Sequence, residues 1–238
     1  KMSIFDTMEK RHHVVKYKPE PVPDRLMKDL LYKAWKISPS KNNFMPYQVN
    51  VIGPNHQEEK TKMWNMVVGN HKFYEKIGNE TANKHLAHKY KFEINPNYEH
   101  VRYNSHLLVF TSRVCPEPNE YYKRMVQKRG HYAEQCEVDQ VLDCAEATSV
   151  EVGLFASHFS GLCIENGVDT SFCACIRKNV NLWKEFPYLW YDKENQHARV
   201  LLIMSVGYGE DYRYQWLRKE RASTEDIKPE YYEIIKWI

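Results

Sequence analysis

The most regular patterns of apolar and polar residues along the chain are helical. Apolar side chains recur every three or four residues from Asp24 to Ile37, which predicts an amphipathic helix that Pro39 ends. A longer pattern of the same kind predicts a helix over 139–166, with Gly167 as its C-terminal cap. Shorter helices are predicted over 6–11, 57–68 and 179–186. The long helix carries small residues that would let another helix or a flat ligand approach closely: Ala145, Ala147, Ser149, Gly153, Ala156 and Gly161.

Short apolar runs predict the strands. The run over 200–206 predicts a central strand, and the run over 106–111 predicts a second buried strand. Further strands are predicted over 47–52 and 170–173. Because helical segments separate these strands, the chain is expected to form an α+β or α/β sheet covered by helices. We expect one domain over residues 1–238, with a polar surface excursion at about 69–105 and a charged, aromatic tail from about 208.

Composition narrows the class of protein. With 238 residues, 42% of them hydrophobic, the chain can bury a substantial core. Its 34 basic and 31 acidic side chains leave a net charge of only +3, which does not favour a nucleic-acid partner. No apolar run is long enough to cross a bilayer, and the first residues lack the apolar segment of a signal peptide. We therefore expect a cytoplasmic protein with no membrane partner.

The cysteine and histidine spacings indicate neither a disulfide framework nor a metal site. The six cysteines are spaced unlike a small disulfide scaffold or a zinc site, so we interpret them as free thiols in a reducing compartment. His85 and His88 could share a helix face, but no matching ligand pattern accompanies them. No metal is expected.

Three polar clusters are candidates for a binding site. The first is residues 11–13, Arg-His-His, with Lys16, whose cationic groups suit a phosphate or a carboxylate. The second is the loop 39–47, Pro-Ser-Lys-Asn-Asn-Phe-Met-Pro-Tyr, whose hydroxyl and amides could contact the polar edge of a heterocycle. The third is residues 218–221, Arg-Lys-Glu-Arg, which could hold the same anion. Each cluster also fits a structural role, as a solvated basic turn, a helix-capping turn and a solvated charge run.

Several common catalytic motifs are absent from the sequence. It contains no Gly-x-Gly-x-x-Gly dinucleotide loop, no Gly-x-x-x-x-Gly-Lys-Ser/Thr phosphate loop and no Gly-x-Ser-x-Gly nucleophile turn. A Rossmann dehydrogenase or a hydrolase of the nucleophile-turn type is therefore not supported. If the protein is an enzyme, a bound cofactor is expected to carry the chemistry.

In this order along the chain, these segments resemble the nitroreductase family of flavoproteins. Residues 11–17 look like that family's opening Arg-Arg/His-Ser-x-Arg/Lys-x-Phe element, and residues 39–47 look like its Pro-Ser-x-x-Asn-x-Gln-Pro-Trp loop. The long helix and the strand after it resemble the family's central helix and its following strand. Residues 206–210 and 219–221 resemble its closing Gly-Tyr segment and Lys-x-Arg. The match spans nearly the whole chain.

The resemblance implies an α+β fold in which a central mixed, mainly antiparallel sheet is flanked by helices. It also implies a homodimer with FMN bound at the dimer interface. The activity it implies is reduction of FMN by NADH or NADPH, followed by reduction of a small-molecule electron acceptor such as a nitroaromatic or a quinone, in a ping-pong cycle. Two alternatives stay open: an FMN carrier or sensor with little turnover, and a nucleic-acid-binding protein that uses its basic patch at 218–221.

The resemblance assigns residues to the FMN site by position. Those near the phosphate and ribityl chain are Arg11, His12, His13, Lys219 and Arg221; those near the polar groups of the ring are Ser40, Lys41 and Asn43; and a backbone N–H of Ala174 or Cys175 would face N5. No side chain is expected to act as a nucleophile.

Four residues depart from the family's pattern. His13 stands where the opening element usually has serine. Val15 stands where the opening element usually has a basic residue near the N1–C2=O edge of the flavin, and Lys16 or Lys41 could supply that charge. Met45 replaces a glutamine, and Cys175 stands where glycine is common. These departures bear on the flavin potential and on the choice of substrate.

Overall fold

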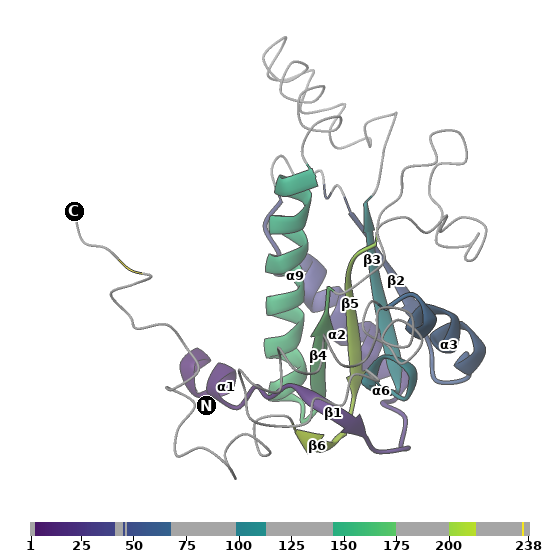
Figure 1. The fold of residues 1–238 in the computed structure, drawn as a ribbon. Coiled ribbons are helices and arrows are strands. Elements are labelled where there is room, and N and C mark those ends of the chain that lie inside the picture. The colour runs from purple at the N-terminus through teal and green to yellow at the C-terminus, as the bar shows by residue number, and fades with distance from the viewer. Residues whose placement is uncertain are drawn as a thin grey trace.

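A four-stranded antiparallel sheet forms the centre of the protein, in the order β2-β3-β5-β4. Its strands are β2 (Tyr47–Ile52), β3 (His106–Ser112), β5 (Val200–Gly207) and β4 (Asp169–Cys173). The computed structural model describes residues 3–40, 45, 47–67, 99–112, 145–174, 200–212 and 235. Figure 1 shows the four strands side by side, with the long helix α9 running along them.

Helices cover both faces of this sheet. Helices α2 (Asp24–Ile37) and α9 (Ala145–Glu165) pack on one face, and α3 (Gln57–Asn65) and α6 (Glu99–Arg102) lie on the other (Figure 1). Because successive side chains of a strand point to opposite faces, β3 directs Leu108 and Phe110 to the α9 side and Leu107 and Val109 to the α3 side. All four are fully buried. A strand covered on both faces is apolar throughout, which explains the uninterrupted apolar run in β3.

The structure confirms the α+β class and most of the predicted elements within its described ranges. α2 begins at Asp24 and ends two residues before Pro39, and β3 and β5 are the two interior strands. Gly167 follows α9 with φ at +70°, and the Val168 N–H donates to the Cys163 carbonyl oxygen (2.9 Å), which makes Gly167 the predicted cap. None of the described helices is both long enough and apolar enough to span a membrane. The predicted helix at 179–186, the segment 139–144 and the excursion up to residue 98 lie outside the described residues.

Two helix boundaries differ from the prediction. α1 spans Ile4–Glu9 rather than 6–11, because Ser3 caps its first turn. The Ser3 Oγ accepts a hydrogen bond from the Asp6 N–H, and the Asp6 carboxylate accepts one from the Ser3 N–H. α3 ends at Asn65 rather than at 68, because Met66 and Val67 turn into the core and are buried there.

A second, two-stranded sheet ties the start of the chain to residues after β5. β1 (Val14–Tyr17) pairs antiparallel with β6 (Gly209–Tyr212), where the sequence predicts the start of a tail. The Tyr17 hydroxyl donates to the Ser205 carbonyl oxygen of β5 (3.0 Å). A Cβ atom on Gly207 would lie 2.8 Å from the Tyr17 ring, so glycine is required there for Tyr17 to pack against β5. These contacts hold β1 against the end of the main sheet.

Candidate functional site

The N-terminal motif, Arg11-His12-His13, lies immediately before β1 and beside β4, an outer strand of the sheet. Ser171 of β4 fixes the adjoining backbone. The Val14 N–H donates to the Ser171 Oγ (2.7 Å), and the same hydroxyl donates to the Val14 carbonyl oxygen (2.7 Å). Both residues are fully buried. The backbone is therefore anchored one residue after the motif ends.

The motif crosses β4, so that its side chains contact both faces of the sheet. The Arg11 guanidinium lies 5.6 Å from the centroid of the Phe172 ring, and Phe172 packs against the core on the α9 face. The His13 ring lies edge-on to the ring of His100 at 5.1 Å, and His100 is buried in α6 on the opposite face. All three residues of the motif are partly exposed. The motif therefore presents cationic and imidazole groups at one edge of the sheet.

Two nearby cations differ in what they contact. Among the described residues Arg11 has no acidic partner, so none of them neutralises its guanidinium, a group that binds phosphates and carboxylates well. Lys16, a candidate for the charge missing at Val15, instead forms an ion pair with Glu210 of β6 (3.0 Å). Both side chains of that pair are largely exposed, so it contributes little to stability. Lys41, the other candidate, lies outside the described residues.

In the loop 39–47, the described residues show how Ser40 shapes the backbone. The Met45 N–H donates to the Ser40 Oγ (2.7 Å), and Met45 has a φ of +48°. A non-glycine residue in this left-handed region costs about 1–2 kcal/mol, which the hydrogen bond offsets in part. Ser40 thus stabilises the turn, as one interpretation of the sequence holds. Its hydroxyl hydrogen stays available for a second bond, so its predicted contact with a cofactor remains a prediction.

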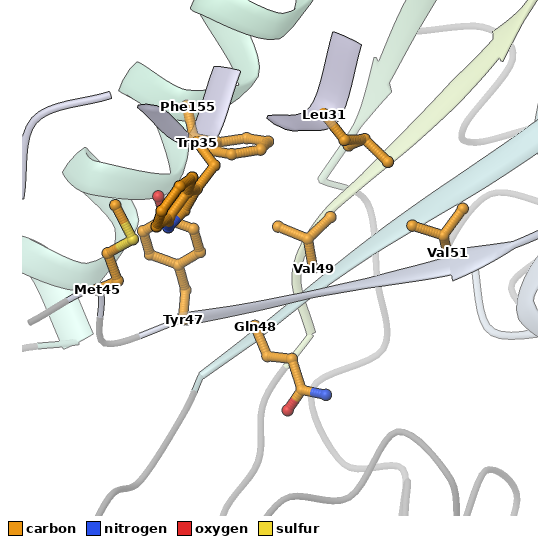
Figure 2. A pocket seen from close by; sticks show the side chains of 8 residues that line it. All are labelled: Leu31, Trp35, Met45, Tyr47, Gln48, Val49, Val51 and Phe155. Carbon is orange, nitrogen blue, oxygen red and sulfur yellow. The ribbon is translucent and has the colours of Figure 1, made fainter. Parts of the chain in front are cut away.

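The loop 39–47 also borders an apolar groove of about 420 Å³ between α2, β2 and the middle of α9. Figure 2 shows Trp35, Met45, Tyr47 and Phe155 gathered at one end of the groove, whereas Gln48 points away from the other lining side chains. Burial, and then the nearby Glu151 carboxylate, raise the pKa of Tyr47 to about 12, so its hydroxyl stays neutral. The groove therefore suits apolar or aromatic surfaces.

Among the comparisons with known proteins, only the solved structures give matches. No protein-family model and no curated protein match the sequence. Solved structures do match: a nitroreductase family protein from Streptococcus pneumoniae has a TM-score of 0.63 at 12% identity, covering 99% of this chain and 100% of its own. The chain has the nitroreductase fold. Iodotyrosine deiodinase bound to FMN and 3-iodo-L-tyrosine matches with a TM-score of 0.58 at 17% identity, covering 89% of this chain and 92% of its own. A candidate NAD(P)H:FMN oxidoreductase from Staphylococcus epidermidis matches with a TM-score of 0.54 at 16% identity, covering 95% of both chains.

Within this nitroreductase fold, one chain holds the N-terminal motif and the loop 39–47 at opposite edges of the sheet. Arg11 lies over Phe172 of β4, while the loop leads into β2. β2 and β4 are the outer strands of the order β2-β3-β5-β4. Three inter-strand spacings separate them, which is about 14 Å. No hydrogen bond or ion pair between described residues joins Arg11 to Ser40.

The other predicted site residues are only partly covered by the structure. Ala174 is exposed and follows the last residue of β4, Cys173, so the predicted strand ends there. Cys163 and Cys173 are buried free thiols, as predicted for the cysteines in general. In the described ranges no group of three or more potential ligands could hold a metal ion. The predicted site residues outside these ranges are Lys41, Asn43, Cys175, Lys219 and Arg221.

A buried lysine supports the part of the fold that holds His100. Lys60 of α3 is 0% exposed, and its amine donates to the carbonyl oxygens of Asn104 and Ser105 (2.8 Å each). The Asn104 amide in turn donates to the carbonyl oxygens of His100 and Val101 (2.9 Å each). This network connects α3 through one turn to α6, and so to the ring that contacts His13. The sequence gives no signal for this network, because Lys60 looks like any other charged residue of a polar helix.

Lys60 should make the stability of the protein depend on pH. Burial lowers the pKa of Lys60 from 10.5 to about 8. Between these values the unfolded chain keeps a proton that the folded chain has released, so the free energy of unfolding rises with pH. Between pH 7.5 and 10.5, the free energy of unfolding of wild type should rise by up to about 3 kcal/mol more than that of Lys60→Met. Urea unfolding measures both.

A matched control separates this effect from other titrations. Lys33 is exposed on α2 and pairs with Asp29 (2.7 Å), so Lys33→Met should follow the wild-type pH dependence. Parallel pH curves for wild type and Lys60→Met would show that burial does not lower the pKa of Lys60.

Proposed function

We propose that the protein is an FMN-dependent oxidoreductase that uses NADH or NADPH to reduce a small electrophilic acceptor, such as a nitroaromatic or a quinone. The observation that carries the proposal is the N-terminal motif at the edge of β4, where Arg11 has no acidic partner among the described residues. A guanidinium presented in this way suits a phosphate monoester. FMN, when bound, supplies the two-electron chemistry for which the sequence offers no motif of its own.

The proposed roles of the site residues follow from the charge and hydrogen-bonding capacity of each. Arg11, with Lys219 and Arg221, neutralises the phosphate, and His12 and His13 donate to the phosphate and the ribityl hydroxyls. Ser40, Lys41 and Asn43 contact the polar edge of the ring, and a backbone N–H of Ala174 or Cys175 approaches N5. The FMN complex of iodotyrosine deiodinase, which has the same fold, supports this choice of cofactor.

We further propose that two chains build each FMN site. The N-terminal motif and the loop 39–47 lie at opposite edges of one sheet, and a second copy could bring its own loop to the motif. A surface suited to such a dimer runs along α9. This stripe consists of Val150, Gly153, Leu154 and Ser157, all exposed and spaced to share one helix face.

The stripe has the composition expected of a helix–helix contact. Val150 and Leu154 are 63% and 39% exposed, and a Cβ atom on Gly153 would meet nothing within 4 Å. Two apolar side chains beside a glycine leave room for a second helix to pack closely. We therefore assign the stripe to the interface between the two protomers.

Placing a charge on this stripe should separate the protomers. Leu154→Asp puts one carboxylate on each side of a two-fold interface, where both would be desolvated. We expect the dimer dissociation constant, measured by sedimentation, to rise by at least about 100-fold while the circular dichroism spectrum stays unchanged. Ile4→Asp is the matched control, because Ile4 is 83% exposed and lies off the stripe. A dimer unaffected by Leu154→Asp would place the interface elsewhere.

The absorption spectrum of the purified protein tests the proposed function. We expect a yellow protein with the flavin bands of bound FMN, bleached by NADH or NADPH without oxygen and restored by an acceptor. Colourless protein that FMN does not reconstitute would exclude the proposal.

A second candidate is an FMN carrier with little turnover. It is favoured by Val15 at a usually basic position and by the pairing of Lys16 with Glu210. In that case the bound FMN would resist reduction by both nicotinamides.

A further inference from the structure

We propose that Ser171 is a positioning residue for the cofactor phosphate, acting through the backbone of the N-terminal motif. This inference rests on the proposed function, because it takes Arg11 and His13 as FMN contacts. Ser171 itself is fully buried, and its hydroxyl bonds to the backbone of Val14, the residue after the motif. Its role would therefore be to hold the motif in place rather than to contact the cofactor.

The geometry at Val14 shows why one hydroxyl matters. The pairing of β1 with β6 is irregular, with shifts in register after Val14 and after Lys16. Both backbone polar groups of Val14 are bonded to the Ser171 hydroxyl, which accepts from the N–H and donates to the carbonyl oxygen at 2.7 Å each. Val14 is itself 0% exposed, so water cannot replace these bonds. Removing the hydroxyl takes one hydrogen bond from each of these two buried backbone groups, and the start of β1 should shift to restore them.

Such a shift would be transmitted directly to the cationic groups. His13 adjoins Val14 and contacts His100 on the α6 face, while Arg11 reaches Phe172 on the α9 face. The motif therefore crosses β4 at the place where Ser171 holds the chain. Ser171 and Phe172 are consecutive residues of β4, and the first fixes the backbone while the second lies under the guanidinium. Loss of the backbone anchor should misplace groups that bind the phosphate and leave the surface for the flavin ring unchanged.

The test compares two ligands that differ only in the phosphate. We expect Ser171→Ala to weaken FMN binding by about 10-fold, measured by the quenching of flavin fluorescence, and riboflavin binding by a smaller factor, because riboflavin can use only the ribityl contacts of the motif. Ser205→Ala is the matched control. Ser205 lies directly opposite Ser171 on β5, is equally buried, and its hydroxyl has no hydrogen-bond partner in the described residues. It should leave the ratio of FMN to riboflavin affinity at the wild-type value.

A second pair of variants keeps the test decisive if Ser171→Ala does not fold. Ser171→Thr retains the hydroxyl, and valine in Ser171→Val has nearly the same shape as threonine but no hydroxyl. Only the valine variant should therefore lower the ratio of FMN to riboflavin affinity. An unchanged ratio in both Ser171→Ala and Ser171→Val, with FMN bound by wild type, would overturn the positioning role and leave the proposed function intact. Wild-type protein that binds no FMN would overturn both.

Discussion

Replacing Arg11 with leucine should weaken FMN binding by about 10- to 100-fold, the loss expected when one or two charge-assisted hydrogen bonds to a phosphate disappear. The structure supports a large effect, because no described acidic group competes for this guanidinium. Leucine can still pack on the Phe172 ring, so the fold should be kept. Arg11→Lys keeps the charge but cannot form two parallel bonds, and its loss should be smaller.

A control variant separates this effect from a general loss of positive charge. Arg25 is exposed at the start of α2 and belongs to no proposed site, so Arg25→Leu should bind FMN as wild type does. The dissociation constant of FMN can be followed by fluorescence at two salt concentrations. Equal losses for Arg11→Leu and Arg25→Leu would mean that the N-terminal motif attracts FMN only through net charge.

Replacing Phe110 with alanine should lower the free energy of unfolding by about 3–5 kcal/mol. Phe110 lies at the centre of β3, is 0% exposed and packs edge-on against Phe155 of α9, with 5.7 Å between ring centroids. The cavity would open between the sheet and its longest helix, where neither element can close it without leaving the other. This loss would be a large part of the total stability of a typical domain.

A substitution of an exposed aromatic residue by alanine gives the cost expected on the surface. Tyr32 is 57% exposed on α2, so Tyr32→Ala should cost less than about 1 kcal/mol. Urea unfolding of the two variants and of Phe110→Leu gives the comparison, with the leucine variant between the extremes. A similar small cost for Phe110→Ala would mean that α9 is not packed on the sheet as described.

The elements that the sequence predicts well are those whose signal is local. The three- and four-residue spacing of α2 and the stop at Pro39 lie within one segment, and so do the apolar runs of β3 and β5. Gly167 could be predicted as a cap because glycine readily adopts the positive φ that ends a helix. Interior strands are buried on both faces, so their sequences are continuously apolar, and this pattern allows them to be predicted.

The parts that the sequence does not predict depend on contacts between distant residues. The sequence of β6 has no alternating or continuous apolar pattern. β6 forms because β1, near the other end of the chain, pairs with it. Ser171 looks like an ordinary polar residue of a short strand until Val14, 157 positions away, is placed against it. His100 and Lys60 lie in polar segments where burial has no local signal. The sequence therefore supplies candidate residues for the site, but it gives no signal of the contacts that support them.

The most direct test of the account is complementation between two defective chains. Arg11→Leu impairs the motif, and the double variant Ser40→Ala, Asn43→Ala impairs the loop 39–47, so each homodimer should bind FMN more weakly than wild type at both of its sites. If each site takes its motif from one protomer and its loop from the other, a mixed dimer contains one intact site and one site with both defects. Co-expressed chains carrying two different tags, purified through both, should bind one FMN per dimer. Mixed dimers that bind no more FMN than either homodimer would contradict a site shared between two chains.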